Sequence, residues 1–223
     1  MDEPESTAPT QLPPLSFEEL RVLGCLIEKE YTTPDYYPLT LNALATACNQ
    51  STNRDPVVSF DDTTIINALE RLKARNFVFQ VTMAGARVQK YKHNIAGKFP
   101  RLEKAQIALL CTLMLRGPQT VGELRQRTER LQVFPDLQAI EEQLTLLIEY
   151  PEGPLVVCFP PGGGRRVASF AHLLGGDVAT PEPVQIVAPA STEWIEPGWK
   201  EGIESQIAAL RQELADLKAQ LGA

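Results

Sequence analysis

The chain has 223 residues, 43% of them hydrophobic and 22% charged, so it can bury a hydrophobic core in one or two domains of ordinary size. No stretch approaches the roughly 18 to 20 apolar residues that span a bilayer, and the acidic, proline-containing start is unlike a secretory signal, so we expect a cytoplasmic protein with no membrane partner. The formal net charge of −7 excludes a protein that coats nucleic acid through bulk electrostatics.

The first predicted element is a helix that follows a proline-containing lead-in. Residues 1–14 hold few apolar side chains, so we expect this segment to be disordered. Ser16 and Glu19 have the spacing of a capping box, in which each side chain accepts a hydrogen bond from the backbone of the other residue. The apolar residues that follow predict a helix as far as about Lys29.

Two further helices are predicted after a loop rich in Thr, Pro and Tyr. Thr40 is suited to cap a helix that runs to about Cys48, because threonine favours the position just before a helix. Asp61 or Asp62 can cap a third helix in the same way. The predicted inner face of this third helix consists of Ile65, Ile66, Leu69 and Leu72.

A β-hairpin is predicted next, because the apolar period changes from helical spacing to alternation. The alternating residues are Phe77, Phe79, Val81 and Met83. Ala84-Gly85 marks a turn, and the chain runs back from Val88 to Tyr91. Three helices and a hairpin are the elements of a winged helix, which is a helix-turn-helix with a β-ribbon attached. We predict one such domain over residues 15–98.

The pattern of the first predicted domain repeats in the second half of the chain. The matched residues are Thr40 and Leu44 with Thr120 and Leu124; Asp61, Ile65, Leu69 and Leu72 with Asp136, Ile140, Leu144 and Leu147; and Gly85, Arg87, Tyr91 and His93 with Gly164, Arg166, Phe170 and His172. Preserved order inside each element is typical of a duplicated domain. The predicted fold is therefore α+β but mainly α, with two tandem winged-helix domains, the second over residues 99–176.

A linker and a helix are predicted to complete the chain. Residues 177–200 contain four prolines and are interpreted as a linker. Residues 201–223 have the apolar spacing of a coiled-coil-like C-terminal helix. Its seam consists of Ile203, Ile207, Leu210, Leu214, Leu217 and Leu221. So short a seam needs a partner, which favours a homodimer, and docking onto the body of the same chain is the alternative.

Three strings in the predicted domains are distinctive. They are TTPDYYPLTLNALATACNQSTNRDPV at residues 32–57, LRGPQTVGELRQR at residues 115–127 and GGGRRVASFAHLLGG at residues 162–176. In these strings the chain resembles the YceH family of bacterial proteins, over about residues 15–176. The resemblance implies tandem winged-helix domains in a bacterial cytosol, and it carries over no activity.

Positive charge is concentrated in the middle of the chain. Residues 71–104 hold nine Lys and Arg against one acid, a balance of +8, and they include the end of the third helix and the wing of the first predicted domain. In DNA-binding winged helices these two elements contact base edges and phosphates. The predicted DNA contacts are Thr64, Asn67, Arg71, Lys73, Arg75, Arg87, Lys90 and Lys92. The alternative is a solvated surface whose charge is consumed by ion pairs with Glu28, Glu30 or Glu70.

The polar loop between the second and third predicted helices is longer than a turn requires. Its candidate contact residues, for bases, phosphates or a protein, are Asn49, Gln50, Ser51, Asn53 and Arg54. In the alternative interpretation, its Asn and Asp side chains bond to backbone groups and fix an irregular loop.

The second predicted domain is less suited to DNA. Its third helix, from Asp136 to Glu149, carries four acids and no Lys or Arg, and only Arg165 and Arg166 on the wing are favourable. Residues 177–223 are acidic as well, with eight acids and three bases. These regions favour a protein partner or plain solvent.

Catalysis and metal binding have little support in the sequence. Cys25, Cys48 and Cys111 lie among apolar residues and are interpreted as core, and no Cys-x-x-Cys pair occurs. His93 and His172 occupy equivalent wing-end positions, which duplication explains. We expect no enzyme activity, metal or cofactor. The leading hypothesis is a dimeric, transcription-regulator-like protein that binds double-stranded DNA. The alternative is a protein-interaction scaffold resembling the tandem winged-helix subunits of chromosome-condensing complexes.

Overall fold

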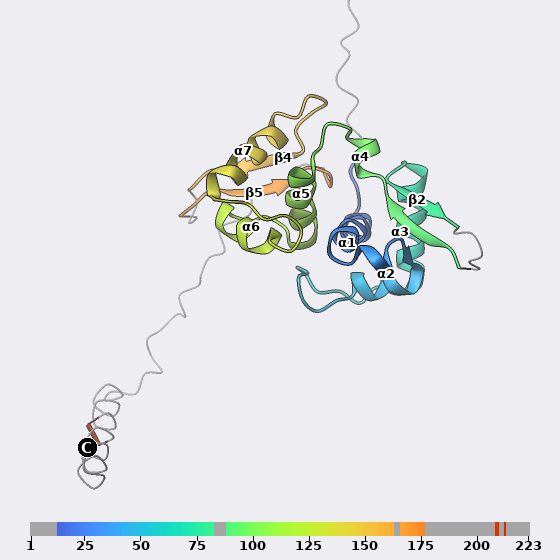
Figure 1. Cartoon of the computed structure of the whole chain (residues 1–223), viewed down its shortest axis with the longest axis horizontal. Helices are drawn as coiled ribbons and strands as arrows, with labels where there is room; N and C mark the ends of the chain where they lie inside the picture. The colour runs from blue at the N-terminus through green and yellow to red at the C-terminus, as the bar shows by residue number, and fades with distance from the viewer. Residues whose placement is uncertain (1–12, 83–87, 163–165, 177–207, 210–211, 213–223) are drawn as a thin grey trace, which may run out of the picture. The chain divides into compact units, whose positions relative to one another are not determined.

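Helices and two small antiparallel sheets build a mixed α and β fold (Figure 1). The computed structural model describes residues 13–82, 88–162 and 166–176, together with Ala208, Ala209 and Gln212. The described residues as far as 176 belong to one unit of the chain, and the three near the C-terminus are helical and belong to another. In these described parts, no helix is long and apolar enough to cross a membrane.

The first helix, α1 (Phe17–Thr32), begins at the predicted capping box. The Ser16 hydroxyl accepts a hydrogen bond from the Glu19 N–H at 3.3 Å, and the Glu19 carboxylate accepts one from the Ser16 N–H at 2.6 Å. The helix runs to Thr32 rather than to Lys29. A 3-10 turn, η1 (Pro34–Tyr36), and a two-residue strand, β1 (Leu39–Thr40), follow it.

The next helices, α2 (Leu41–Cys48) and α3 (Asp62–Ala74), begin at predicted caps. Thr40 accepts a hydrogen bond from the N–H of Ala43, and Asp61 accepts one from the N–H of Thr64. The buried face of α3 consists of Ile65, Ala68, Leu69 and Leu72. The prediction that Ile66 faces inward is wrong, because this side chain is 41% exposed.

A three-stranded sheet completes the first half. The strands β2 (Val78–Val81) and β3 (Lys90–His93) form the predicted hairpin, and β1 pairs with the other edge of β3. The return strand begins at Lys90 rather than at Val88. A short helix, α4 (Ile95–Lys98), which was not predicted, follows the sheet.

The second half repeats this order of elements. Thr120 and Asp136 cap its second and third helices, as Thr40 and Asp61 do in the first half. A bridge between Gln119 and Phe170 takes the place of the β1–β3 pairing. The elements are α5 (Lys104–Arg116), α6 (Val121–Thr128), α7 (Leu137–Ile148), β4 (Val156–Phe159) and β5 (Ser169–His172).

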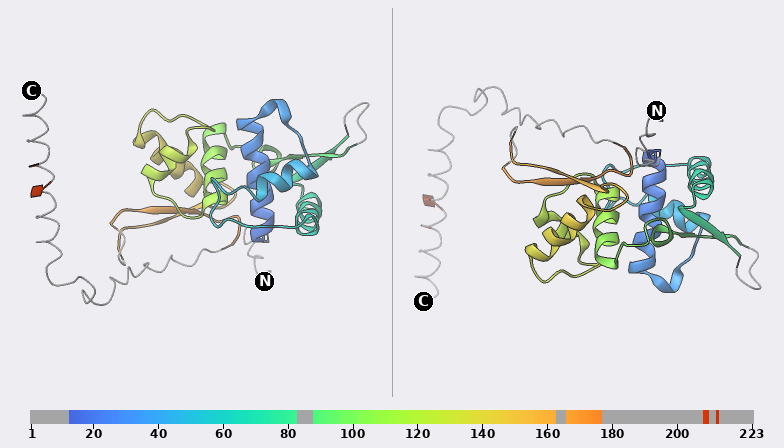
Figure 2. Two further views of the ribbon diagram at one scale, coloured as in Figure 1. Left: turned by 90° about the horizontal axis from the view of Figure 1, so that it is seen from below. Right: turned by 90° about the horizontal axis from the view of Figure 1, so that it is seen from above.

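The two halves share one hydrophobic core, in which α1 packs against α5 (Figure 2). At this contact Gly24 allows a close approach, and the Cys111 thiol of α5 donates to the Gly24 carbonyl at 3.3 Å. Cys25 and Cys48 are buried as well, as predicted, whereas Cys158 is exposed. The division into domains near residue 98 stays a prediction.

Gly24→Val is expected to lower the free energy of unfolding by about 1–3 kcal/mol, because the added carbons overpack the contact between α1 and α5. A Cβ atom at Gly24 would lie 2.9 Å from the Leu115 Cδ2 atom. Urea denaturation followed by circular dichroism measures the change. Gly122→Val is the matched control, since a Cβ atom at that helical glycine meets nothing within 4 Å. Equal losses in the two variants would contradict the account.

Several predictions lie outside the described residues. These are the lead-in as far as residue 12, Met83, the Ala84-Gly85 turn and Arg87 of the first predicted wing, Gly164 and Arg165 of the second, the linker over residues 177–200, and all six residues of the C-terminal seam. The homodimer therefore stays a prediction.

Candidate nucleic-acid interface

The predicted helix contacts lie on the face of α3 that points away from the core. Of these contacts, Asn67 and Arg71 are exposed, and they form one line along the helix with the exposed Thr63 one turn earlier. Thr64 is half-buried, and its backbone N–H donates a hydrogen bond to the Oδ1 atom of the capping residue Asp61 at 2.8 Å. Within the described residues, Arg71 has no carboxylate at ion-pair distance.

Acidic groups near this face are partly compensated by their neighbours. The carboxylate of Glu70 forms an ion pair with Lys73. A hydrogen bond from Ser16 is the main cause that lowers the pKa of Glu18 on α1, and the charge of Arg71 also lowers it. The pKa of Asp61 is lowered by its hydrogen bonds to Thr64. Glu18 and Asp61 are therefore ionised at neutral pH, and the face carries charges of both signs.

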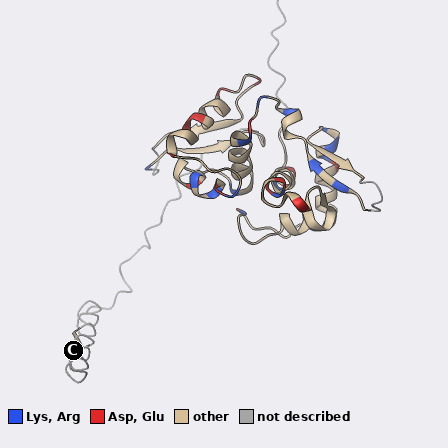
Figure 3. Ribbon diagram, in the orientation of Figure 1, with Lys and Arg blue, Asp and Glu red and all other residues tan. Residues whose placement is uncertain are grey.

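Two lysines lie on the hairpin beside α3. Lys92 is exposed, and its Nζ atom lies 6.0 Å from the ring centroid of Phe79, directly across the strand pair. Lys90 is half-buried and two residues away on β3, so it shares the same face of the sheet. Figure 3 shows these cations on β3, near those of α3. Sequence reasoning placed Phe79 in the strand but not at the candidate interface. The register of the hairpin pairs it with Lys92.

The ammonium of Lys73 connects α3 to the hairpin. Its Nζ atom lies 2.9 Å from the Glu70 Oε1 atom and 2.9 Å from the Gln80 Oε1 atom of β2. The charge is paired and partly shielded, with a side-chain exposure of 27%. Lys73 therefore stabilises the packing of α3 against the hairpin, and it is a weaker candidate for phosphate contact than Lys92.

Arg75 follows α3 and faces another part of the molecule. Its guanidinium donates to the carbonyls of Pro13 and Pro14, lies 3.7 Å from the Glu19 carboxylate, and packs 5.5 Å from the Phe77 ring centroid. These partners hold the side chain against the start of α1. Sequence reasoning grouped it with the DNA contacts because a helix end gives no indication of which surface its last residue meets.

The polar loop between α2 and α3 is fixed by its own side chains. Asn49 donates to the Phe60 carbonyl at 2.8 Å and accepts from the Phe60 N–H at 2.7 Å. Asn53 adopts a left-handed backbone with φ of 59° and accepts a hydrogen bond from Arg116 of α5. Gln50 contacts Lys29 of α1. These bonds agree with the loop-fixing interpretation, and the loop joins the two halves.

Arg54, proposed from the sequence as a loop contact, is buried at 5% exposure. Its guanidinium forms two hydrogen bonds with the carboxylate of Glu28, at 3.1 and 2.5 Å, and donates to the carbonyls of Ala47 and Asn53. Burial acts to lower the pKa of Arg54, but the hydrogen bonds that it donates to Glu28 raise this pKa above the ordinary value. Its donors are used inside the protein. Of the predicted loop contacts, Ser51 has an exposed side chain.

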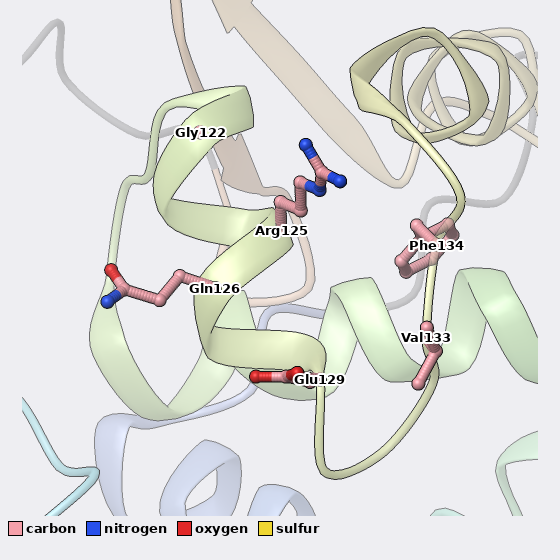
Figure 4. A pocket seen from close by; sticks show the side chains of 6 residues that line it. All are labelled: Gly122, Arg125, Gln126, Glu129, Val133 and Phe134. Carbon is pink, nitrogen blue, oxygen red and sulfur yellow. The ribbon is translucent and has the colours of Figure 1, made fainter.

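The second half presents a different surface. The exposed face of α7 carries the acids Glu141 and Glu142, and beside them Leu137 and Leu146 are exposed as well, which was not predicted. The helix α6 carries cations that sequence reasoning did not single out. Figure 4 shows one of them, Arg125, beside a hollow of about 320 Å³ between α6 and the chain before α7. An acid and apolar groups also line this hollow.

The two histidines occupy equivalent strand ends, as the duplication predicts. His93 lies 2.5 Å from a carboxylate oxygen of Glu30, and burial lowers its pKa despite the opposing effect of Glu30. His172 is half-buried with a buried Nδ1 atom that has no hydrogen-bond partner among the described residues, and this burial lowers its pKa to about 4. In the part of the chain that the structure describes, no cluster of three His, Cys, Asp or Glu residues is arranged to hold a metal.

Comparison with known proteins identifies relatives along most of the chain. The model of a family described as "Protein of unknown function, DUF480" matches residues 15–165. A UPF0502 protein of Geobacter metallireducens is 48% identical over 183 residues, which are 78% of this chain and 82% of that protein. A UPF0502 protein of Photobacterium profundum is 41% identical over 209 residues, covering 91% and 94%. One of Geotalea uraniireducens is 51% identical over 160 residues, 71% of each chain.

Proposed function

The chain belongs to the DUF480 family of proteins of unknown function, and we propose that it is a non-enzymatic, tandem winged-helix protein that binds double-stranded DNA. The repeated order of helix, helix, helix and hairpin supports the winged-helix proposal. The equivalent caps of Thr40 with Thr120, and of Asp61 with Asp136, support the duplication. In DNA-binding winged helices the third helix and the hairpin are the elements that approach DNA, and the proposal places these contacts on the first domain.

The observation that carries the proposal is a set of cations on adjacent elements of the first half. Arg71 on α3 and Lys90 and Lys92 on β3 have no carboxylate at ion-pair distance among the described residues. Such groups can replace the counterions of DNA phosphates. Asn67 lies one turn before Arg71 on the exposed face of α3, where an amide can read an adenine edge.

Assembly of two copies completes the proposed regulator. The predicted seam from Ile203 to Leu221 pairs two chains, so that two first domains meet a DNA site together. The proposed setting is the bacterial cytoplasm, where the free thiols of Cys25, Cys48 and Cys111 stay reduced.

Full-length protein is expected to bind mixed genomic DNA fragments at low salt and to bind them more weakly at physiological salt. The variant Arg71→Glu, Lys90→Glu, Lys92→Glu is expected to weaken binding by about tenfold to a hundredfold, because repulsion replaces three phosphate contacts. Fluorescence anisotropy with labelled fragments gives the affinities.

A control variant with the same change in charge separates the effect of this particular surface on DNA binding from the effect of the protein's net charge. Lys104→Glu, Arg125→Glu, Arg130→Glu alters exposed cations elsewhere in the unit. The proposal expects this variant to retain most of the binding. An equal loss in the two variants, or no binding by the unaltered protein at low salt, would count against the proposed surface.

A second candidate function is protein interaction through the second half. Leu137 is 43% exposed, Leu146 is 51% exposed and Val133 is 69% exposed, and the helix between them carries acids rather than cations. Exposed apolar groups beside like charges favour a protein partner over a phosphate backbone. This function becomes the leading proposal if DNA binding is absent.

A further inference from the structure

A cavity of about 510 Å³ lies at the junction of the two halves, away from the outer face of α3. Its walls come from the end of α3, the chain around α4, the segment after α7 and the residues after β5, while Pro13 and Pro14 border it from the N-terminal side. This volume falls within the roughly 300–1,000 Å³ typical of small-molecule sites. The cavity is therefore large enough for an organic ligand.

Three aromatic residues form a continuous apolar wall. The ring centroids of Phe77 and Phe99 are 6.2 Å apart, and those of Phe99 and Tyr150 are 5.9 Å apart in an edge-to-face arrangement. All three residues are buried and line the cavity. Aromatic rings packed in this way offer a rigid surface to an apolar or planar ligand.

The charge of the cavity favours an anion. Lys98 lies with its Nζ atom 5.3 Å from the ring centroid of Phe77, and within the described residues it has no carboxylate at ion-pair distance. Arg75 approaches the same ring from 5.5 Å. The carboxylate at the cavity, Glu152, pairs with Arg101 at 3.6 Å. A cation without an acidic partner therefore remains for a ligand.

Two buried polar groups at the cavity are poorly satisfied among the described residues. Tyr150 is 6% exposed and lines the cavity, and its hydroxyl has only a weak interaction with the Arg101 backbone. Within the same described part of the chain, the buried Nε atom of Arg75 has no hydrogen-bond partner. Buried polar groups in native proteins are generally satisfied, so unsatisfied donors beside an apolar cavity indicate the position of a polar ligand group.

We propose that this cavity binds an amphipathic organic anion, with its apolar or aromatic body against Phe77, Phe99 and Tyr150 and its acidic group near Lys98. The aromatic wall matches the apolar body of such a ligand, and the unpaired cation matches its acidic group. A neutral apolar molecule leaves Lys98 uncompensated, and an inorganic anion leaves the aromatic wall uncovered. This binding site is separate from the proposed DNA surface and does not depend on it.

The test uses full-length protein and the fluorescent probe anilinonaphthalene sulfonate, which joins an aromatic body to one negative charge. Saturable binding of one probe per chain is expected. Lys98→Gln is expected to weaken binding by about tenfold, because it removes a charge-assisted contact. Lys104→Gln is the matched control, since the Lys104 Nζ atom lies 5.2 Å from the Tyr31 ring, outside the cavity. This control is expected to bind as the unaltered protein does.

A neutral analogue and a second variant separate charge from apolar burial. Phenylnaphthylamine lacks the sulfonate, so its binding is expected to be unaffected by Lys98→Gln. Tyr150→Phe keeps the aromatic wall and removes only the hydroxyl, and it is expected to weaken binding of the anionic probe by about threefold. Absence of saturable binding, or equal binding of the anionic probe to the Lys98→Gln variant and the unaltered protein, would overturn the proposal.

Discussion

Arg54→Met is expected to lower the free energy of unfolding by about 3–5 kcal/mol, because removing one partner of a buried ion pair leaves the other charge uncompensated. The Arg54 side chain is 0% exposed and that of Glu28 is 12% exposed. The substitution also removes the Arg54 hydrogen bonds to the carbonyls of Ala47 and Asn53, so that Ala47 keeps only the weak thiol donor of Cys25. Urea denaturation followed by circular dichroism measures the loss.

The exposed ion pair of Lys73 and Glu70 provides the control for this prediction. Its side chains are 27% and 61% exposed, so Lys73→Met is expected to lower the free energy of unfolding by less than about 1 kcal/mol. The double variant Glu28→Gln, Arg54→Met is expected to be more stable than Arg54→Met alone, since no unpaired carboxylate remains. A loss at Arg54 no larger than the loss at Lys73 would show that the buried pair does not hold the loop.

Acidification from pH 7 to pH 4 is expected to reduce the free energy of unfolding by about 3 kcal/mol through His172 alone. Its pKa in the folded protein is lowered to about 4 by burial, against an ordinary value near 6.5. Below pH 6.5 the unfolded chain binds a proton at this residue, whereas the folded protein stays neutral there until about pH 4. The contribution is therefore fully present above pH 6.5 and is lost as the pH falls.

Comparison with His172→Gln isolates this effect from other titrating groups, such as His93. The difference in free energy of unfolding between the unaltered protein and the variant is expected to change by about 3 kcal/mol between pH 7 and pH 4, and to be constant above pH 7. A difference that does not vary with pH would mean that His172 is protonated as readily in the folded protein as in the unfolded chain.

Local sequence signals predicted most helix starts and the hairpin. Ser16, Thr40 and Asp61 cap the helices expected of them, because a cap depends on residues three positions away. The repeat predicted that Thr120 and Asp136 have the same roles in the second half. Periodicity and capping are local properties, so a single sequence is sufficient to predict them.

Long-range pairing accounts for what the sequence did not predict. The two-residue strand β1 exists because Leu39 pairs with Tyr91, far along the chain. Arg54 resembled a surface contact because its partner Glu28 belongs to another element. The sequence of α5 did carry a signal for the shared core, because it is apolar at most positions. In the structure all its residues from Gln106 to Leu115 are buried. A helix that is apolar on all sides requires neighbours on all sides.

The candidate site was predicted in part. The exposed positions of Asn67, Arg71 and Lys92 follow from helix and strand periodicity. The positions of Lys73 and Arg75 do not, because their partners come from β2 and from the start of α1. The cavity at the junction was not predicted, since its lining residues come from segments distant in the sequence.

The central claim is that Arg71, Lys90 and Lys92 contact DNA phosphates, and the salt dependence of binding tests it most directly. The logarithm of the association constant, plotted against the logarithm of salt concentration, falls by about 0.9 for each phosphate contact. The account predicts a linear decrease for the full-length protein and a slope less negative by about 2 to 3 for Arg71→Glu, Lys90→Glu, Lys92→Glu. Equal slopes for the two proteins would contradict it, because these residues would then displace no counterions.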